Sequence, residues 1–290
     1  MRRFLTALCA ALSLCGASLV MAQDTVAVAA AAPAVGAAAA PAAAPAAPDA
    51  PVAQPLPRGI IKLTGNITAG AKIFAEGKGE APPCLSCHGD TGLGDDNLGT
   101  PRLAGQGFVY LRKQLYEYAA DRRTDTTMGV MNGVAKALSD QDKADVSAYE
   151  SSVHQGALAA ASNLEEVKAA GTVPVGERHL GKGIVLYGIP EQGVPACGSC
   201  HQYNGRGALP VYPTIGGQRY VYLVNQLKQW REGTRANDPL AQMRIVASKL
   251  KDEDIYNVAA YLTSAPPISG GNSHQPHQLQ PAAAGVSAAH

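Results

Sequence analysis

One short motif, Cys-x-x-Cys-His, occurs twice in the chain and limits what the chain can fold into more than any other feature. Cys84-Leu-Ser-Cys87-His88 recurs as Cys197-Gly-Ser-Cys200-His201, an offset of 113 residues. Further landmarks recur at an offset of 112: Pro101 and Pro213, Gln106 and Gln218, Gln114 and Gln226, Met131 and Met243, Leu138 and Leu250, and Tyr149 and Tyr261. Such regularity predicts two copies of one structural unit, each about 90 residues long.

The repeated unit has the sequence pattern of a helical fold. Ile255, Val258, Ala259 and Leu262 fall at i, i+3, i+4 and i+7, the apolar stripe of an amphipathic helix. In the first copy Ser139-Asp-Gln-Asp142 is a capping box for the matching helix. Longer helices are expected over 106–122 and 218–231. No segment alternates with a period of two residues, so both units are predicted to be all-α.

A glycine near the start of each unit predicts a close helix crossing. Gly70-Ala-Lys-Ile73-Phe74 runs parallel to Gly183-Ile-Val-Leu186-Tyr187. Because glycine has no Cβ, it lets a second helix approach closely. Gly70 and Gly183 are therefore the expected crossing points.

The spacing of the repeated motif fits one kind of chemistry. Two cysteines three residues apart can add their thiols to the two vinyl groups of one haem, while the adjacent histidine ligates the iron from the same side. The motif residues therefore predict two covalently bound haem c groups. They are Cys84, Cys87, His88, Cys197, Cys200 and His201. A four-cysteine zinc site is the alternative, but each cysteine pair lies inside its own repeat and has its own histidine.

Each haem iron in an electron carrier needs a second axial ligand. Methionine is the expected one, because Met/His ligation raises the reduction potential. Beyond residue 22 the chain has Met128, Met131 and Met243 as its only methionines. Met131 and Met243 occupy equivalent repeat positions and are the predicted ligands, with Met128 an alternative to Met131. His154 and His179 do not match across the repeats and are expected to be surface or linker histidines.

The regions outside the repeats have other compositions. Arg2 and Arg3 precede an uncharged stretch, which predicts a secretory signal peptide over 1–22 and a periplasmic protein. An uncleaved membrane anchor is the alternative, because the stretch approaches the roughly 20 residues that span a bilayer. The remaining chain is expected to divide as follows: an Ala/Pro-rich linker at 23–63, the first unit at 64–155, an interdomain linker at 156–175, the second unit at 176–265 and a disordered tail at 266–290.

Over about residues 65–265 the chain resembles the dihaem cytochromes c4. Both Cys-x-x-Cys-His sites, both Pro-x-x-x-Gly-Gln elements, both Met…Leu segments, the Tyr110…Gln114 and Tyr222…Gln226 pairs and the 231–235 segment carry the resemblance. It implies two tandem cytochrome c-like domains, each a small helical bundle around one covalently attached haem. It also implies that His88 with Met131, and His201 with Met243, ligate the two irons. Arg102, Gln106 and Gln218 would lie near haem edges or propionates, with Thr214 in place of Arg102 in the second copy.

The implied function is one-electron transfer in the periplasm between membrane respiratory complexes, such as a cytochrome bc1-type donor and a terminal oxidase acceptor. An electron-accepting subunit of a dehydrogenase complex is the alternative. A dihaem peroxidase-type enzyme would need an open iron, and a thiosulfate-oxidising enzyme would need a cysteine ligand beyond the four attachment thiols. The chain is therefore expected not to be an enzyme. A net charge of +1 gives no sign of a nucleic-acid partner.

Overall fold

The computed structural model describes residues 64–153, 162–208 and 210–265, all of which lie within one compact unit, Asp49–His290. The expected signal peptide, the Ala/Pro-rich linker at 23–63 and the tail at 266–290 lie outside the described residues. Within the described part no helix is long and apolar enough to cross a membrane.

Five helices of the first half, α1–α5, correspond in order to α7–α11 of the second. The described part contains isolated β-bridges but no strand, which confirms the all-α prediction. The first half contains α1 (Ile67–Glu76), α2 (Leu85–His88), α3 (Phe108–Ala119), α4 (Met131–Ala137) and α5 (Asp140–Val153). The second contains α6 (Leu164–Ala170), α7 (Arg178–Tyr187), α8 (Gly198–His201), α9 (Tyr220–Glu232), α10 (Gln242–Ala247) and α11 (Asp252–Ser264). Short 3₁₀ turns lie at Pro190–Gln192, Tyr203–Gly205 and Pro239–Ala241.

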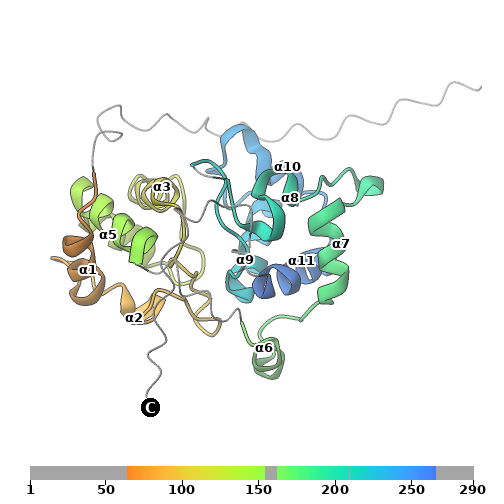
Figure 1. Ribbon diagram of the computed structural model, residues 1–290, viewed down its shortest axis with the longest axis horizontal. Coiled ribbons are helices and arrows are strands. Elements are labelled where there is room, and N and C mark those ends of the chain that lie inside the picture. The colour runs from red at the N-terminus through yellow and green to blue at the C-terminus, as the bar shows by residue number, and fades with distance from the viewer. Residues whose placement is uncertain (1–63, 154–161, 209, 266–290) are drawn as a thin grey trace, which may run out of the picture. The chain divides into compact units, whose positions relative to one another are not determined.

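In the first half, α1 packs against α5 (Figure 1). Gly70 makes the approach close, because a Cβ there would overlap the carbonyl oxygen of Asp145 on α5. The predicted capping box begins α5: Ser139 N donates to Asp142 Oδ2 at 3.0 Å, and Asp142 N donates to Ser139 Oγ at 3.2 Å. These contacts fix the two helices that close one side of the first half.

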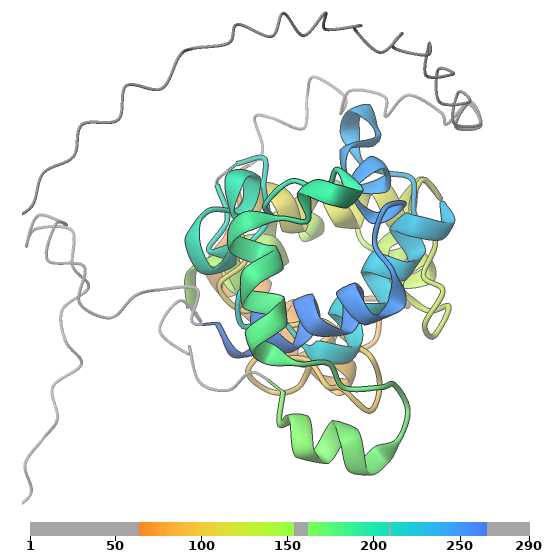
Figure 2. The same cartoon turned by 90° about the vertical axis from the view of Figure 1, so that its right-hand side faces the viewer.

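In the second half, α7 crosses α11 in the same way (Figure 2). The predicted stripe on α11 is confirmed, since Ile255, Val258, Ala259 and Leu262 are all buried. The prediction that Gly183 is the crossing residue is wrong, because a Cβ there would meet nothing within 4 Å. A Cβ at Gly181 would instead overlap the carbonyl oxygen of Asn257. Gly70 therefore matches Gly181, an offset of 111, and the repeat gains two residues between this crossing and the cysteine motif.

The two long helices predicted from the repeat are present as α3 and α9. They begin and end within three residues of the expected ranges 106–122 and 218–231. Each follows a Pro-x-x-x-Gly-Gln loop that lies against the central cavity described below. These loops and helices therefore carry corresponding parts of the two candidate sites.

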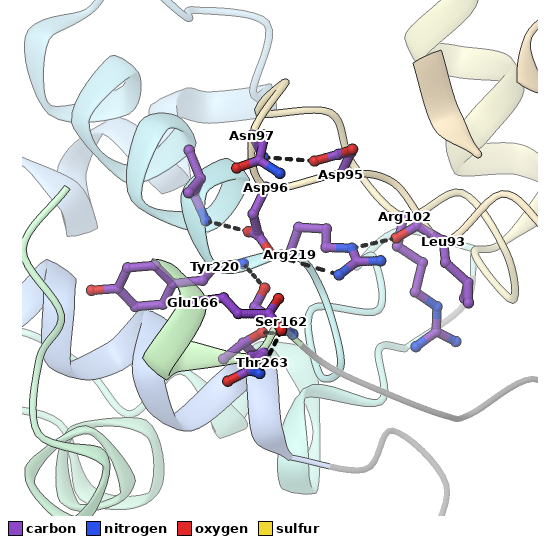
Figure 3. A network of polar contacts seen from close by, with 12 residues as sticks. Leu93, Asp95, Asp96, Asn97, Arg102, Ser162, Glu166, Arg219, Tyr220 and Thr263 are labelled. Carbon is purple, nitrogen blue, oxygen red and sulfur yellow. Dashed lines mark hydrogen bonds and ion pairs between the residues drawn. The ribbon is translucent and has the colours of Figure 1, made fainter. Parts of the chain in front are cut away.

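The described part of the expected linker 156–175 packs against the second half. It contains α6, whose Val167 belongs to the second hydrophobic core. Ser162 Oγ accepts a hydrogen bond from Tyr220 N at 2.7 Å, and Ser162 N donates to Thr263 Oγ1 at 3.0 Å (Figure 3). Residues 162–175 thus add to the second unit, and the predicted domain boundaries stay a prediction.

A reciprocal pair of glutamines joins the two halves. Gln106 Nε2 donates to Thr214 O and Gln106 Oε1 accepts from Thr214 N, both at 2.8 Å. Gln218 does the same with the backbone of Arg102, at 3.0 and 2.7 Å. Because Thr214 and Arg102 are themselves repeat-equivalent, the contact has the form of a twofold, self-complementary interface.

A third inter-half contact breaks this symmetry. Arg219 Nε donates to Leu93 O at 2.7 Å, and its guanidinium lies 3.6 Å from Asp96 Oδ2 (Figure 3). Asp96 also accepts a hydrogen bond from Val221 N at 3.0 Å, so that it caps the start of α9 from the other half. The repeat counterpart of Arg219 is Gly107, which has no side chain to make the matching pair.

Candidate haem-binding cavity

A cavity of about 960 Å³ runs between the two halves and is lined by both. All eight predicted site residues lie along it: Cys84, Cys87, His88, Met131, Cys197, Cys200, His201 and Met243. Its volume is near the upper end of the ~300–1,000 Å³ common for small-molecule pockets. The structure therefore brings the predicted residues of each repeat to one space large enough for a sizeable group, and their roles as ligands and attachment points stay predictions.

Both motif histidines are buried with one ring nitrogen engaged. His88 Nδ1 lies 3.0 Å from Pro101 O, and His201 Nδ1 lies 2.9 Å from Pro213 O. A carbonyl oxygen only accepts, so each Nδ1 carries the proton and donates it, which leaves the Nε2 lone pair for a metal. Burial lowers the pKa of both histidines and so favours the neutral, ligating form.

The four thiols are free and lie at the edge of the same space. In each pair the first cysteine is the N-cap of a single helical turn, α2 or α8, and the second cysteine and the histidine lie within that turn. All four cysteines and both histidines line the cavity. Burial raises the pKa of Cys84 and of Cys197 to about 11. In the described residues no three His, Cys, Asp or Glu side chains gather as a metal site, so the two cysteine pairs do not form the alternative zinc centre.

Met131 is the first residue of α4, and a carboxylate fixes the loop before it. Asp125 Oδ2 accepts from Val130 N at 3.0 Å and from Met131 N at 3.2 Å. Asn132 fastens the same loop by donating to Tyr118 O and Arg123 O, both at 2.9 Å. The methionine is therefore held by its backbone, independently of any ligand.

In the second half a different acid holds Arg244, the residue that follows Met243. Asp238 Oδ1 accepts from Arg244 Nε at 2.8 Å, and Asp238 Oδ2 accepts from Arg244 N at 3.0 Å. Asp238 does not correspond to Asp125, whose repeat counterpart is Asn237. The two copies thus keep the methionine position, while the acid that anchors the chain beside it differs.

A buried carboxyl distinguishes the first half of the cavity. Glu150 is 2% exposed and lines the cavity, and burial raises its pKa to about 8. It contributes to the raised pKa of Cys84, after the larger effect of burial. The repeat counterpart of Glu150 is Leu262, so the second half offers an apolar surface at this position.

The residues present fit two haem groups. A haem needs an apolar slot, a neutral imidazole with a free ring nitrogen, two thiols beside it and a sixth ligand. Each half supplies all four along the cavity. Arg102, Gln106 and Gln218 also line the cavity, but their hydrogen bonds join the two halves, and they lie at the junction.

A second set of polar residues along the cavity was not among the predicted site residues. Arg123 and Arg235 are buried and line it, and they too are 112 residues apart. Tyr118 and Trp230, on which they stack, follow the same offset. The offset alone could have drawn attention to these four residues, although their contacts across the two halves have no signature in the sequence.

Comparison with known proteins gives a consistent result. The cytochrome c family model matches residues 67–153 and 194–266. A cytochrome c4 of Stutzerimonas stutzeri is 38% identical over 208 residues, covering 69% of this chain and 92% of the relative. A thiosulfate dehydrogenase electron acceptor of Stutzerimonas stutzeri (strain A1501) is 31% identical over 211 residues, covering 71% and 90%. The crystal structure of reduced cytochrome c4 from Pseudomonas stutzeri matches with a TM-score of 0.55 at 34% identity, covering 70% of this chain and 100% of that one.

Proposed function

Because the chain belongs to the cytochrome c family, as a dihaem electron-transfer cytochrome of the cytochrome c4 type with covalently bound haem c, we propose that it carries single electrons between respiratory complexes in the periplasm. The donor would be a cytochrome bc1-type complex and the acceptor a terminal oxidase. The export signal predicted over residues 1–22 supports the compartment.

The observation that carries the proposal is the presence of a histidine and a methionine from each half along the cavity. His88 with Met131, and His201 with Met243, would hold the two haem irons. Ligation by both residues would leave the iron no site for peroxide or another substrate. The remaining chemistry of a bound haem is a one-electron change of its iron.

The chain's own residues prepare the sites for that change. The carbonyl oxygens of Pro101 and Pro213 orient the two imidazoles and fix their tautomers. Asp125 and the Asp238–Arg244 pair hold the methionine loops in place. A ligand set fixed in advance needs little rearrangement when the charge of the iron changes, which favours fast electron transfer.

A second candidate function is that of an electron acceptor for a dehydrogenase. The relative named as a thiosulfate dehydrogenase electron acceptor favours it, since that protein matches over 90% of its length. In this case an enzyme would carry out the sulfur chemistry, and the present chain would receive the electrons. Both candidates need the same two haem sites and differ in the donor.

Rapid mixing of the oxidised holoprotein with each donor tests the two candidates. The full chain, purified with its haems, is mixed with a quinol-reduced bc1-type complex, or with thiosulfate dehydrogenase and thiosulfate, and haem reduction is followed by absorbance. Fast reduction by the first and reoxidation by an oxidase-containing membrane support the shuttle. Fast reduction by the dehydrogenase alone supports the second candidate. Turnover of thiosulfate or peroxide by the chain on its own would contradict both.

A further inference from the structure

One buried carboxyl on the cavity wall has no place among the predicted haem ligands and attachment residues. Glu150 lies on α5, is 2% exposed and lines the cavity. Burial of a carboxyl is costly in its charged form, so its protonation state depends strongly on any other charge that the cavity holds. Glu150 is therefore placed to respond to a change of charge in the first half.

The two halves build the backbone around this position in the same way. Gly105 N donates to Glu150 O at 3.2 Å, and in the second half Gly217 N donates to Leu262 O at 2.8 Å. Glu150 and Leu262 are both 2% exposed, and both line the cavity. The position is thus structurally equivalent in the two halves, and an ionisable side chain occupies it in the first half only.

Each of the two side chains packs over the same glycine of the loop that follows the motif histidine. A Cβ added at Gly92 would lie 2.5 Å from Glu150 Oε2, and one added at Gly205 would lie 3.1 Å from Leu262 Cδ2. Gly92 and Gly205 are 113 residues apart, which is the offset of the cysteine motifs. A carboxyl oxygen in the first half therefore takes the place of a leucine methyl group in the second.

The carboxyl interacts electrostatically with the haem-attachment motif of its own half. Its charge raises the pKa of the Cys84 thiol and of the Tyr149 hydroxyl, in both cases after the larger effect of burial. Burial raises the pKa of Glu150 itself to about 8, so this side chain changes its charge close to neutral pH. In the holoprotein the Cys84 sulfur would be a thioether, which does not titrate, and Glu150 would remain titratable.

Other charged or titratable side chains lie on the elements around Glu150. They are Lys72 and Glu76 on α1, Cys84, Cys87 and His88 around α2, Asp90 in the following loop, Arg112 and Tyr116 on α3, and Lys143 and Tyr149 on α5 itself. Lys72 and Glu76 form an exposed ion pair, and burial raises the pKa of Tyr116 to about 12. Burial also lowers the pKa of Lys143. A test of Glu150 must therefore change residue 150 or its repeat counterpart and leave these groups in place.

We propose that Glu150 is a proton-binding site coupled to the first haem alone: it takes up a proton when that iron is reduced and releases it when that iron is oxidised. The redox partner supplies one electron, which reduces the iron from the ferric to the ferrous state. Water supplies one proton, which forms the O–H bond of the neutral carboxyl. The inference rests on haem binding in this cavity and not on which partners the protein serves.

The direction of the coupling follows from the charges. An ionised carboxylate stabilises the ferric iron, because ferric iron carries one more positive charge than ferrous iron. By the reciprocity of linked equilibria, reduction of the iron raises the pKa of Glu150, and the carboxyl binds a proton. Leu262 cannot bind a proton, so the second haem lacks this coupling.

The test is the pH dependence of the two reduction potentials, measured by spectroelectrochemistry on the full holoprotein between about pH 5 and 10. In the wild type one potential should fall as the pH rises and Glu150 ionises. The equilibrium constant for reduction of that haem should fall roughly tenfold in all, about 59 mV for one electron. The other potential should change much less. Two flat potentials, or equal slopes at both haems, would overturn the proposal, and this measurement needs no variant to fold.

Glu150→Leu gives the first half the residue of the second. The pH-dependent potential should lose its slope and exceed the wild-type value at the alkaline end of the range by the same factor of roughly ten. At the acid end the two should agree, because protonated glutamic acid is neutral. Glu150→Gln, which keeps a polar side chain of similar size, should behave in the same way. A slope retained in both variants would assign the proton to another group, such as a haem propionate, and would contradict the proposal.

Leu262→Glu is the matched reciprocal variant, because it places a carboxyl at the equivalent position of the second half. It should give the other potential a pH slope and leave the first as in the wild type. If Glu150→Leu and Leu262→Glu act on the same potential, the proposal is wrong. Infrared difference spectra give an independent readout: on reduction the wild type should gain the carbonyl stretch of a protonated carboxyl, and Glu150→Gln should not. Absence of that band from the wild type would also refute proton uptake.

Discussion

At the scale of single residues, the repeat counterparts of Met128 and Met131 distinguish the two methionines that are alternative ligands of the first iron. Met128 and Met131 both line the cavity. Met128 corresponds in the repeat to Leu240, which is 85% exposed and has no sulfur. Met131 corresponds to Met243, whereas the backbone N–H groups of Met128 and Met131 both donate to Asp125. The repeat therefore favours Met131 as the ligand.

Replacing the two methionines one at a time tests this assignment. Met131→Ala should abolish the far-red methionine–iron absorption band of one haem and leave about half of the total intensity, because the second half keeps Met243. Met128→Leu should leave the band unchanged, as leucine is the residue at the equivalent position of the second half. The measurement is the absorption spectrum of the oxidised holoprotein. A full band in Met131→Ala would show that another residue ligates the first iron.

At the scale of helices, each half depends on one crossing that only glycine permits. α1 meets α5 at Gly70, and α7 meets α11 at Gly181, each against a backbone carbonyl. A backbone atom cannot move aside as the end of a flexible side chain can. The crossing therefore fixes a pair of helices that contributes at least half of the buried residues of each hydrophobic core.

Two glycines on α7 give opposite expectations for the same substitution. Gly181→Ala places a Cβ into the carbonyl of Asn257 and should destabilise the holoprotein by about 1–3 kcal/mol or more, the usual result of overpacking. Gly183→Ala meets nothing within 4 Å and should stabilise by up to about 1 kcal/mol, because alanine favours a helix. Denaturant midpoints of the two variants measure the difference. Equal effects would mean that this crossing does not limit stability.

The helices show how far sequence alone could go. The buried stripe on α11, the capping box of α5 and the extents of α3 and α9 all follow from local patterns, and the structure confirms them. The register of α7 against α11 does not follow from local patterns. The segment between the crossing glycine and the cysteine motif is two residues longer in the second repeat than in the first. The local sequence around Gly183 resembles that around Gly70 on α1. Only the packing against α11 shows that Gly181 is the structural counterpart of Gly70.

At the scale of the whole molecule, the two halves recognise each other through equivalent residues. The glutamine of each Pro-x-x-x-Gly-Gln loop binds the backbone of the opposite loop. The sequence shows these glutamines as repeat landmarks but cannot show that they face one another. Their partners are backbone groups, which carry no residue-specific signal. The repeat offset also locates Arg123 and Arg235, but nothing in the sequence shows that they contact glutamine and tyrosine side chains of the opposite half.

Removing both glutamines should loosen the junction without damaging either haem site. In the Gln106→Ala/Gln218→Ala variant six backbone groups lose a partner, four of them across the junction, at about 1–3 kcal/mol for each that stays buried. We expect a larger radius of gyration in X-ray scattering and slower electron exchange between the haems, with the spectrum of each haem retained. Gln141→Ala, which affects contacts within the first half only, is the control. An unchanged scattering profile would refute a structural role for the pair.

The twofold form of the junction bears on how such a chain can diverge. A self-complementary surface is what two identical subunits use to pair, and covalent joining gives each a millimolar effective concentration of the other. Association of the two halves then no longer depends on protein concentration, and the sequence of each repeat can change independently of the other. Two such departures are visible in the repeat: Gly107 is the counterpart of Arg219, and Leu262 is the counterpart of Glu150. Duplication thus lets one scaffold offer two unequal redox environments at a fixed separation, which a symmetric dimer of identical chains cannot do.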